Sequence, residues 1–164
     1  MRFVVAALLA PAVLALAACG GGGGGTNQTG PRLTKDEFIS RADGICGSAK
    51  TSAGEIDFGI VDPTSAEATK ADLRKLADAL ARGVFVFRKE IADLRKLRPP
   101  ADFDKRFGES LGYLDGSVDA AEKGLGAARR GDKKELARAL DESDRLSSKA
   151  SAIARDYGLV TCGG

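Results

Sequence analysis

Four long segments of this chain place apolar residues at alternating steps of three and four, which is the spacing of one face of an α-helix. The second segment keeps the pattern over a long run: Leu73, Leu76, Leu80, Val84, Phe87, Ile91 and Leu94. Amphipathic helices joined by short turns bury their apolar faces by packing side by side. The chain is therefore predicted to be all-α, with residues 32–164 forming an antiparallel four-helix bundle.

Residues suited to helix ends separate these segments. Two pairs have the spacing of a capping box, in which side chain and backbone bond each other across the first turn: Thr34 with Glu37 and Thr64 with Glu67. Asp132 stands at the cap position of the fourth helix. Four residues are expected to stop helices: Pro99, Pro100, Gly131 and Gly158. We therefore expect the second helix to begin at residue 65 and the fourth at residue 133.

The N-terminal residues have the layout of a secretory leader. A basic start at Arg2 precedes an apolar run, residues 3–18, that is interrupted by Pro11 and closes with small residues. The run is shorter than the ~20 residues that a membrane-spanning helix needs, and glycine follows it. Residues 1–18 are therefore predicted to be a signal peptide, and the rest of the chain to lie outside the cytoplasm.

The end of this leader, Leu16-Ala17-Ala18-Cys19, resembles the lipobox of bacterial lipoproteins. The resemblance implies that the Cys19 thiol receives a diacylglycerol, that the leader is cut before it, and that the new amine is acylated, for example with palmitate. Each buried CH₂ contributes roughly 0.8 kcal/mol, so two or three chains would hold the protein firmly at the outer face of the cell membrane. Residues 19–31 would then be the lipidated cysteine and a glycine-rich tether. The alternative is an ordinary secreted protein cut near Ala18.

Lipid attachment at Cys19 would leave Cys46 and Cys162 as the remaining cysteines. Two thiols allow one intramolecular pairing, and the compartment outside the membrane permits a disulfide. We expect this bond to join the first helix to the C-terminal tail, because the residues after Gly158 are long enough to reach Cys46. A redox role is disfavoured because the two cysteines do not form a C-x-x-C pair.

Two segments near the ends of the bundle carry a second resemblance. Asp43-Gly44-Ile45-Cys46 and the terminal Y-G-L-x-x-C-G run from Tyr157 to Gly163 are similar to segments of small helical lipoproteins and secreted proteins from high-GC Gram-positive bacteria. The resemblance implies export and a helical bundle, and it carries over no active-site residues.

Composition argues against several classes of function. The chain has no histidine, so the usual general base and the commonest transition-metal ligand are missing. Its 25 basic and 23 acidic side chains nearly balance, whereas nucleic-acid binding needs a clustered basic surface. Asp115, Asp119 and Glu122 share one flank of the third helix, but the loop and carbonyl oxygens of a calcium site are absent, so a solvated flank is favoured. We expect no enzyme activity, no cofactor, no metal and no nucleic-acid partner.

Some residues depart from the amphipathic pattern and are candidates for contact with a partner. Phe85 falls about 140° from the centre of its helix's apolar stripe at 100° per residue. It could bind a protein partner, be covered by the folded-back tail through Leu159 and Val160, or remain exposed. Three glycines repeat every four residues on the expected outer face of the third helix: Gly108, Gly112 and Gly116. They either form a strip on which a partner helix docks, or have no such role and are tolerated in the helix.

These observations favour a lipid-anchored, extracytoplasmic protein that acts without catalysis as an interaction or binding module at the cell envelope. The alternative is a carrier or sensor of a small apolar ligand, because the alanine-rich core and the serines at positions 143 and 147 permit a narrow cavity between the helices. An interior cavity of ~300 Å³ or more would favour the carrier. A dense core with Phe85 exposed would favour the partner surface.

Overall fold

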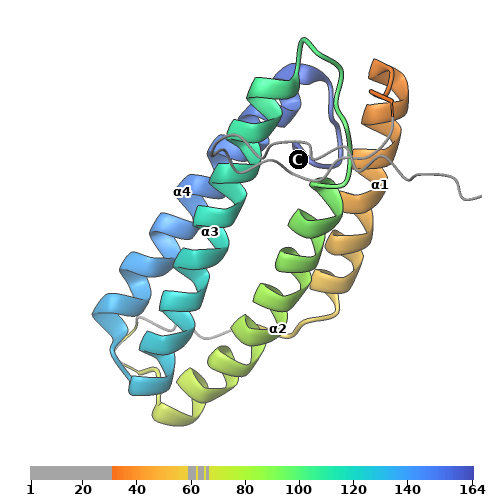
Figure 1. The fold of residues 1–164 in the computed structure, drawn as a ribbon. Coiled ribbons are helices and arrows are strands. Elements are labelled where there is room, and N and C mark those ends of the chain that lie inside the picture. The colour runs from red at the N-terminus through yellow and green to blue at the C-terminus, as the bar shows by residue number, and fades with distance from the viewer. Residues whose placement is uncertain (1–30, 59–61, 63–64, 66) are drawn as a thin grey trace, which may run out of the picture.

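The structure, a computed structural model, describes residues 31–58, 62, 65 and 67–164. Four helices make up most of this part of the chain: α1 (Lys35–Gly54), α2 (Lys70–Leu94), α3 (Asp104–Arg130) and α4 (Lys133–Tyr157). Successive helices run in opposite directions, and each packs against the next (Figure 1). A disulfide joins Cys46 in α1 to Cys162 in the tail after α4. The predicted all-α bundle and its disulfide are confirmed.

The residues expected at several helix ends have the predicted roles. At the start of α1 the Thr34 hydroxyl accepts from the Glu37 N–H at 3.4 Å, and the Glu37 carboxylate accepts from the Thr34 N–H at 2.9 Å. The Asp132 carboxylate caps α4 by accepting a backbone N–H at 3.0 Å. Gly131 (φ +76°) ends α3 and Gly158 (φ +103°) ends α4, in left-handed conformations that favour a residue without a Cβ.

The predicted start of the second helix is wrong. α2 begins at Lys70, later than expected. The Thr69 hydroxyl accepts from the Asp72 N–H at 3.2 Å, and the Asp72 carboxylate accepts from the Thr69 N–H at 2.9 Å. This capping box directly precedes Leu73, so the helix starts where its apolar stripe starts. Thr64, the expected cap, lies outside the described residues.

Contacts between the helices are uneven around the bundle. The backbones of α1 and α4 do not approach each other closely anywhere in the described part of the chain, whereas α3 and α4 pack along their whole length. Aromatic side chains bridge α1 and α4 near the start of α1. Phe38 lies edge-on to Tyr157 with ring centroids 6.1 Å apart, and Phe103 stacks on the same Tyr157 ring at 3.7 Å. One end of the bundle is therefore closed by an aromatic cluster, while α1 and α4 stay apart along their length.

Asp43 of α1 binds the tail that follows α4. Its carboxylate accepts hydrogen bonds from the backbone N–H groups of Val160, Thr161 and Cys162 at 3.0, 2.9 and 3.0 Å. Cys46 lies three residues after Asp43, about one helical turn further along the same helix. The carboxylate and the disulfide therefore hold the same short segment of the tail.

Glycine is required at the residue after Cys162. A Cβ on Gly163 would lie 2.6 Å from the carbonyl oxygen of Leu159, which is closer than a side chain can approach. The fixed letters of the terminal Y-G-L-x-x-C-G segment thus have separate structural roles. Tyr157 stacks on an aromatic ring, Gly158 adopts a positive φ, and Leu159 is buried. Cys162 forms the disulfide, and Gly163 allows a close approach to the backbone.

Replacing Asp43 with alanine is expected to lower the free energy of unfolding by about 2–3 kcal/mol, because three backbone N–H groups lose a charged acceptor. Urea unfolding of the oxidised protein measures this loss. Asp36→Ala, which removes an exposed carboxylate from the first turn of the same helix, is the matched control and should cost about 0.3–1 kcal/mol. Equal losses in the two variants would show that Asp43 does not hold the tail.

Candidate functional site

A cavity of about 580 Å³ lies inside the bundle, and all four helices and the tail contribute to its wall. Apolar side chains line it mainly from α2 and α3: Leu76, Leu80, Val84, Phe87, Ile91, Leu114, Val118 and Ala121. Hydroxyl groups line it mainly from α4: Ser143, Ser147 and Ser151, with Ser117 from α3. The cavity therefore has an apolar side along α2 and α3 and a hydroxyl-bearing side along α4.

Small side chains explain why the bundle leaves this space. Ser143 and Ser147 occupy inward positions of α4 that a leucine stripe would otherwise fill, and both line the cavity as expected from the sequence. The Ser117 hydroxyl donates to the Ser143 carbonyl oxygen at 2.9 Å, so α3 and α4 stay in contact there. From α3, Ala121 is another small residue in the cavity wall. Protein interiors are otherwise close-packed, so a run of small residues on facing helices leaves an open volume.

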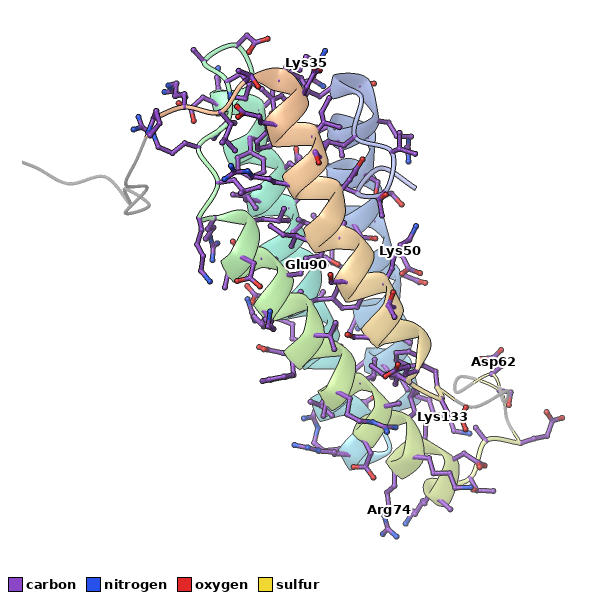
Figure 2. The ribbon with its side chains drawn as sticks, turned by 90° about the vertical axis from the view of Figure 1, so that its right-hand side faces the viewer. Lys35, Lys50, Asp62, Arg74, Glu90 and Lys133 are labelled. Atoms are coloured by element: carbon purple, nitrogen blue, oxygen red, sulfur yellow. A yellow bond between two sulfur atoms is a disulfide. The ribbon has the colours of Figure 1, made fainter. Side chains whose placement is uncertain are left out.

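Glu90 of α2 is a half-buried carboxyl in the wall of this cavity. It lies between α1 and α2 and also borders an outer groove between these two helices (Figure 2). Within the described residues, no hydrogen bond or ion pair joins its carboxyl to another side chain or to the backbone. Burial away from water raises the pKa of Glu90 from 4.5 to about 7. The cavity wall thus contains a carboxyl group that is partly protonated near neutral pH.

The other charged residues of the cavity are exposed. Lys50 lines it from α1 and Asp144 from α4, and both side chains reach water. Figure 2 shows Lys50 on the side of α1 that borders α4, whereas Glu90 lies on the side that borders α2. Lys50 and Asp144 therefore lie at the exposed mouth of the cavity, whereas Glu90 is half-buried in its wall.

Replacing Glu90 with glutamine is expected to remove a pH dependence of stability. Because folding raises the pKa of Glu90, this carboxyl carries no penalty below about pH 4.5, where it is protonated in both states. As the pH rises from 4.5 to about 7, the unfolded chain ionises first and the folded state loses about 1–3 kcal/mol, discounted here for partial solvation. Glu90→Gln should therefore raise the free energy of unfolding at pH 8 and leave it nearly unchanged at pH 4.

Urea unfolding at several pH values measures this effect. Asp144→Asn removes an exposed carboxylate from the same cavity and is the matched control. It should keep the fall in stability between pH 4.5 and 7 that wild type shows. An identical fall in Glu90→Gln would assign the pH dependence to other groups.

Phe85 is 72% exposed, and the alternative in which the tail covers it is wrong. Leu159 is buried in the core instead, and Val160 is held at Asp43 with 79% of its surface exposed. Phe85 borders the outer groove between α1 and α2 together with Val86. The three hydrogen bonds to Asp43 fix the path of the tail, which is why it does not reach Phe85.

The three glycines of α3 do not share one outward face. A Cβ on Gly108 or Gly112 would meet no atom within 4 Å, so these two face outward as expected. A Cβ on Gly116 would lie 3.1 Å from Leu146 Cδ1, so Gly116 faces α4 and its predicted outward position is wrong. Each step of four residues turns a helix by about 40°, which moves Gly116 about 80° around α3 relative to Gly108. Further along α3, Gly124 also faces α4, where an added Cβ would lie at an ordinary contact distance of 3.5 Å from Ala139 Cβ.

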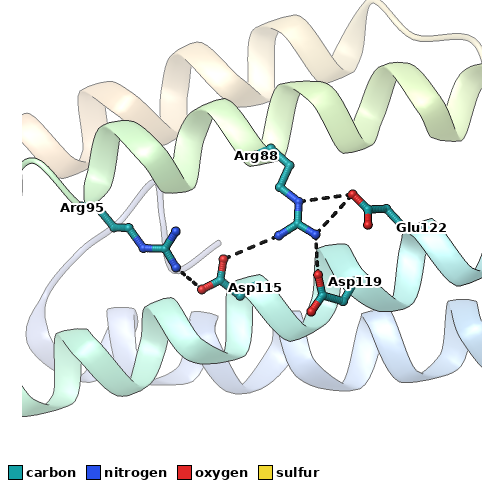
Figure 3. A network of polar contacts seen from close by, with 5 residues as sticks. All are labelled: Arg88, Arg95, Asp115, Asp119 and Glu122. Carbon is teal, nitrogen blue, oxygen red and sulfur yellow. Dashed lines mark hydrogen bonds and ion pairs between the residues drawn. The ribbon is translucent and has the colours of Figure 1, made fainter. Parts of the chain in front are cut away.

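Arg88 of α2 and Arg95, the residue that follows α2, pair with the acidic flank of α3 (Figure 3). Arg88 pairs with Asp119, with Glu122 at 3.2 Å and with Asp115 at 3.7 Å, and Arg95 also pairs with Asp115. The flank therefore joins two helices by ion pairs, each worth about 0.2–1 kcal/mol at an exposed position. Across the described residues, no group of three or more His, Cys, Asp or Glu side chains is placed to hold a metal ion.

Comparison with known proteins found no matching family model, no matching curated protein and no matching solved structure. The predicted signal peptide, residues 1–18, and the predicted lipidation site, Cys19, lie outside the described residues. In the part of the chain that is described, none of the helices is long and apolar enough to span a membrane.

Proposed function

We propose that this chain is a lipid-anchored, extracytoplasmic protein that acts without catalysis by holding a small, largely apolar ligand between its helices. The cavity of about 580 Å³ carries the proposal, because it combines a volume in the range of small-molecule sites, roughly 300–1,000 Å³, with a mainly apolar wall to which all four helices contribute. Its lining is mostly aliphatic and aromatic, with a few hydroxyl groups and the Glu90 carboxyl that can orient a ligand. These features favour a carrier or sensor over a module that acts through its surface alone.

The N-terminal sequence supports a membrane location. The leader and the lipobox-like Leu16–Cys19 favour acyl chains on Cys19, and the resemblance of the two bundle ends to small helical lipoproteins of high-GC Gram-positive bacteria favours the same location. A glycine-rich tether of residues 20–30 would place the start of the bundle within about 20 Å of the membrane surface. A ligand that partitions into lipid would then be within reach.

Direct binding of 1-dodecanol tests the cavity function. The protein for this test is residues 19–164 with Cys19→Ala, which keeps all described residues and removes the acylation site. We expect saturable one-to-one binding in isothermal titration calorimetry and in native mass spectrometry. A helical circular dichroism spectrum establishes that the sample is folded. A folded protein that binds neither dodecanol nor the shorter decanol would contradict the proposed function.

Acylation at Cys19 has its own test. We expect mass spectrometry of the protein from its native membrane to find no leader and an N-terminal Cys19 that carries a diacylglycerol. Cys19→Ala should carry no lipid. An unmodified Cys19, or an intact leader on the native protein, would contradict the anchor while leaving the cavity function open to the binding test.

A surface for a protein partner is the second candidate function, favoured by the 72% exposure of Phe85. Crosslinking in intact membranes, with wild type compared with Phe85→Ala, tests it. Ser148→Ala changes another exposed side chain, one outside the candidate contact residues, and is the control. An unchanged set of captured proteins in Phe85→Ala would remove this candidate.

A further inference from the structure

We propose that Glu90 binds a cationic head group, so that the ligand of the cavity is an amphipathic amine with its protonated nitrogen at Glu90 and its apolar chain along α2 and α3. Because this ligand class presupposes the cavity function proposed above, the experiment below separates the two.

The surroundings of Glu90 leave its charge without compensation. Its carboxyl borders the main cavity, the outer groove and a small void of about 40 Å³ beneath the disulfide. The neighbouring wall consists of the Cys46–Cys162 sulfurs and of apolar side chains such as Ile91 and Leu114. An ionised carboxylate in an apolar environment is costly unless an opposite charge pairs with it. No described side chain supplies that charge, so a ligand cation is the partner that the site lacks.

The other charged residues near Glu90 do not cancel the negative charge that its ionised carboxylate gives to this part of the cavity. From α1, Arg41 borders the outer groove and Lys50 borders the cavity mouth, and both are exposed. From α2 itself, Lys89 is paired with Asp93 at 2.7 Å in the outer groove. From α4, the exposed Asp144 lies at the mouth, and α3 contributes no charged residue to the cavity wall. Glu90 therefore sets the charge of the shielded part of the site.

The shape of the apolar wall indicates an elongated ligand. The lining residues of α2 run from Leu76 to Ile91, which is roughly 22 Å at 1.5 Å per residue. Glu90 stands at one end of this row, beside the disulfide, and Leu76 at the other. A single alkyl chain with a polar group at one end matches this arrangement. Serine hydroxyls from α4 accompany the row and offer no competing charge.

The test compares three ligands that share one alkyl chain and differ in the head group: dodecylamine, 1-dodecanol and dodecanoate. Each is titrated at pH 8 into residues 19–164 with Cys19→Ala, alone and combined with Glu90→Gln or with Asp144→Asn. We expect the amine to bind at least about tenfold more tightly than the alcohol, which corresponds to about 1.4 kcal/mol, and the carboxylate to bind most weakly. Glu90→Gln should bring the amine to within about twofold of the alcohol. Asp144→Asn, which removes a carboxylate from the exposed mouth, should keep the preference.

A second arm varies the pH. An alkylammonium stays protonated well above pH 8, as a lysine side chain does. Lowering the pH to 5.5 protonates Glu90, whose pKa is about 7, and should reduce the preference for the amine in the parent protein but not in Glu90→Gln.

Equal binding of amine and alcohol, or a preference that survives Glu90→Gln, would overturn the cationic head group and leave the cavity function intact. Loss of the preference in Asp144→Asn alone would overturn the assignment to Glu90. Failure of all three ligands to bind a folded protein would overturn the cavity function as well.

Discussion

Removing the disulfide, in a Cys46→Ala/Cys162→Ala double variant, is expected to lower the free energy of unfolding by about 3–5 kcal/mol. The bond joins residues that are 116 positions apart, so it restricts the unfolded chain more than a short loop would. Asp43 still binds the tail in the variant, and much of the native contact at that end should therefore persist. The loss should come chiefly from the greater freedom of the unfolded chain. Urea unfolding followed by circular dichroism measures it.

Reduction of the wild-type protein is the matched comparison. Dithiothreitol should move the wild-type unfolding midpoint towards that of the double variant and leave the variant's midpoint unchanged. A difference below about 1 kcal/mol between oxidised and reduced protein would mean that the reduced chain keeps most of the restriction that the bond imposes.

Filling the cavity from α4 should weaken ligand binding without unfolding the protein. Ser147 lines the cavity, and its hydroxyl donates locally to the Asp144 carbonyl oxygen at 3.0 Å, so no other helix loses a hydrogen bond when it is replaced. We expect Ser147→Leu to raise the free energy of unfolding by about 1–2 kcal/mol through burial of the added methyl and methylene groups. The dissociation constant for 1-dodecanol should rise at least about tenfold, because the side chain occupies the ligand's volume.

Ser148→Leu controls for the added apolar surface. Ser148 is exposed on the same helix and does not line the cavity, so the variant should bind dodecanol as the parent protein does. Urea unfolding and calorimetry of both variants complete the comparison. Unchanged binding in Ser147→Leu would place the ligand elsewhere on the protein.

The sequence predicts most of this fold because its signals are local. Apolar stripes, Gly131 and Gly158 are read within single helices, and the bundle follows from their number and the short turns between them. The start of α2 is the exception, since the predicted box at Thr64 and the observed one at Thr69 have the same spacing. Local pattern alone does not choose between them. The buried apolar stripe begins at Leu73, and this favours the capping box at Thr69.

The site was harder to predict because it depends on how far the helices stand apart. Ser143 and Ser147 indicated a cavity between the helices. The volume of this cavity depends on the separation of α1 and α4, which the sequence of a single helix does not determine. Glu90 was missed, although one signal could have found it. On a helix its neighbours three before and four after are Phe87 and Leu94, both members of the apolar stripe, so a carboxyl at that position borders the core. The path of the tail was likewise unpredictable, because Asp43 fixes it by contacts across 117 residues and more.

The disulfide also determines the stage at which the cavity wall becomes covalently linked. Cys46, Thr161 and Cys162 all belong to the cavity wall, so the bond that fastens the tail also completes the chamber. In a reducing interior, the three hydrogen bonds to Asp43 would hold the tail against this side of the cavity without the covalent bond. If the protein is exported as proposed, the disulfide would form outside the membrane. The cavity wall would then gain its covalent link in the compartment where the proposed ligand is bound.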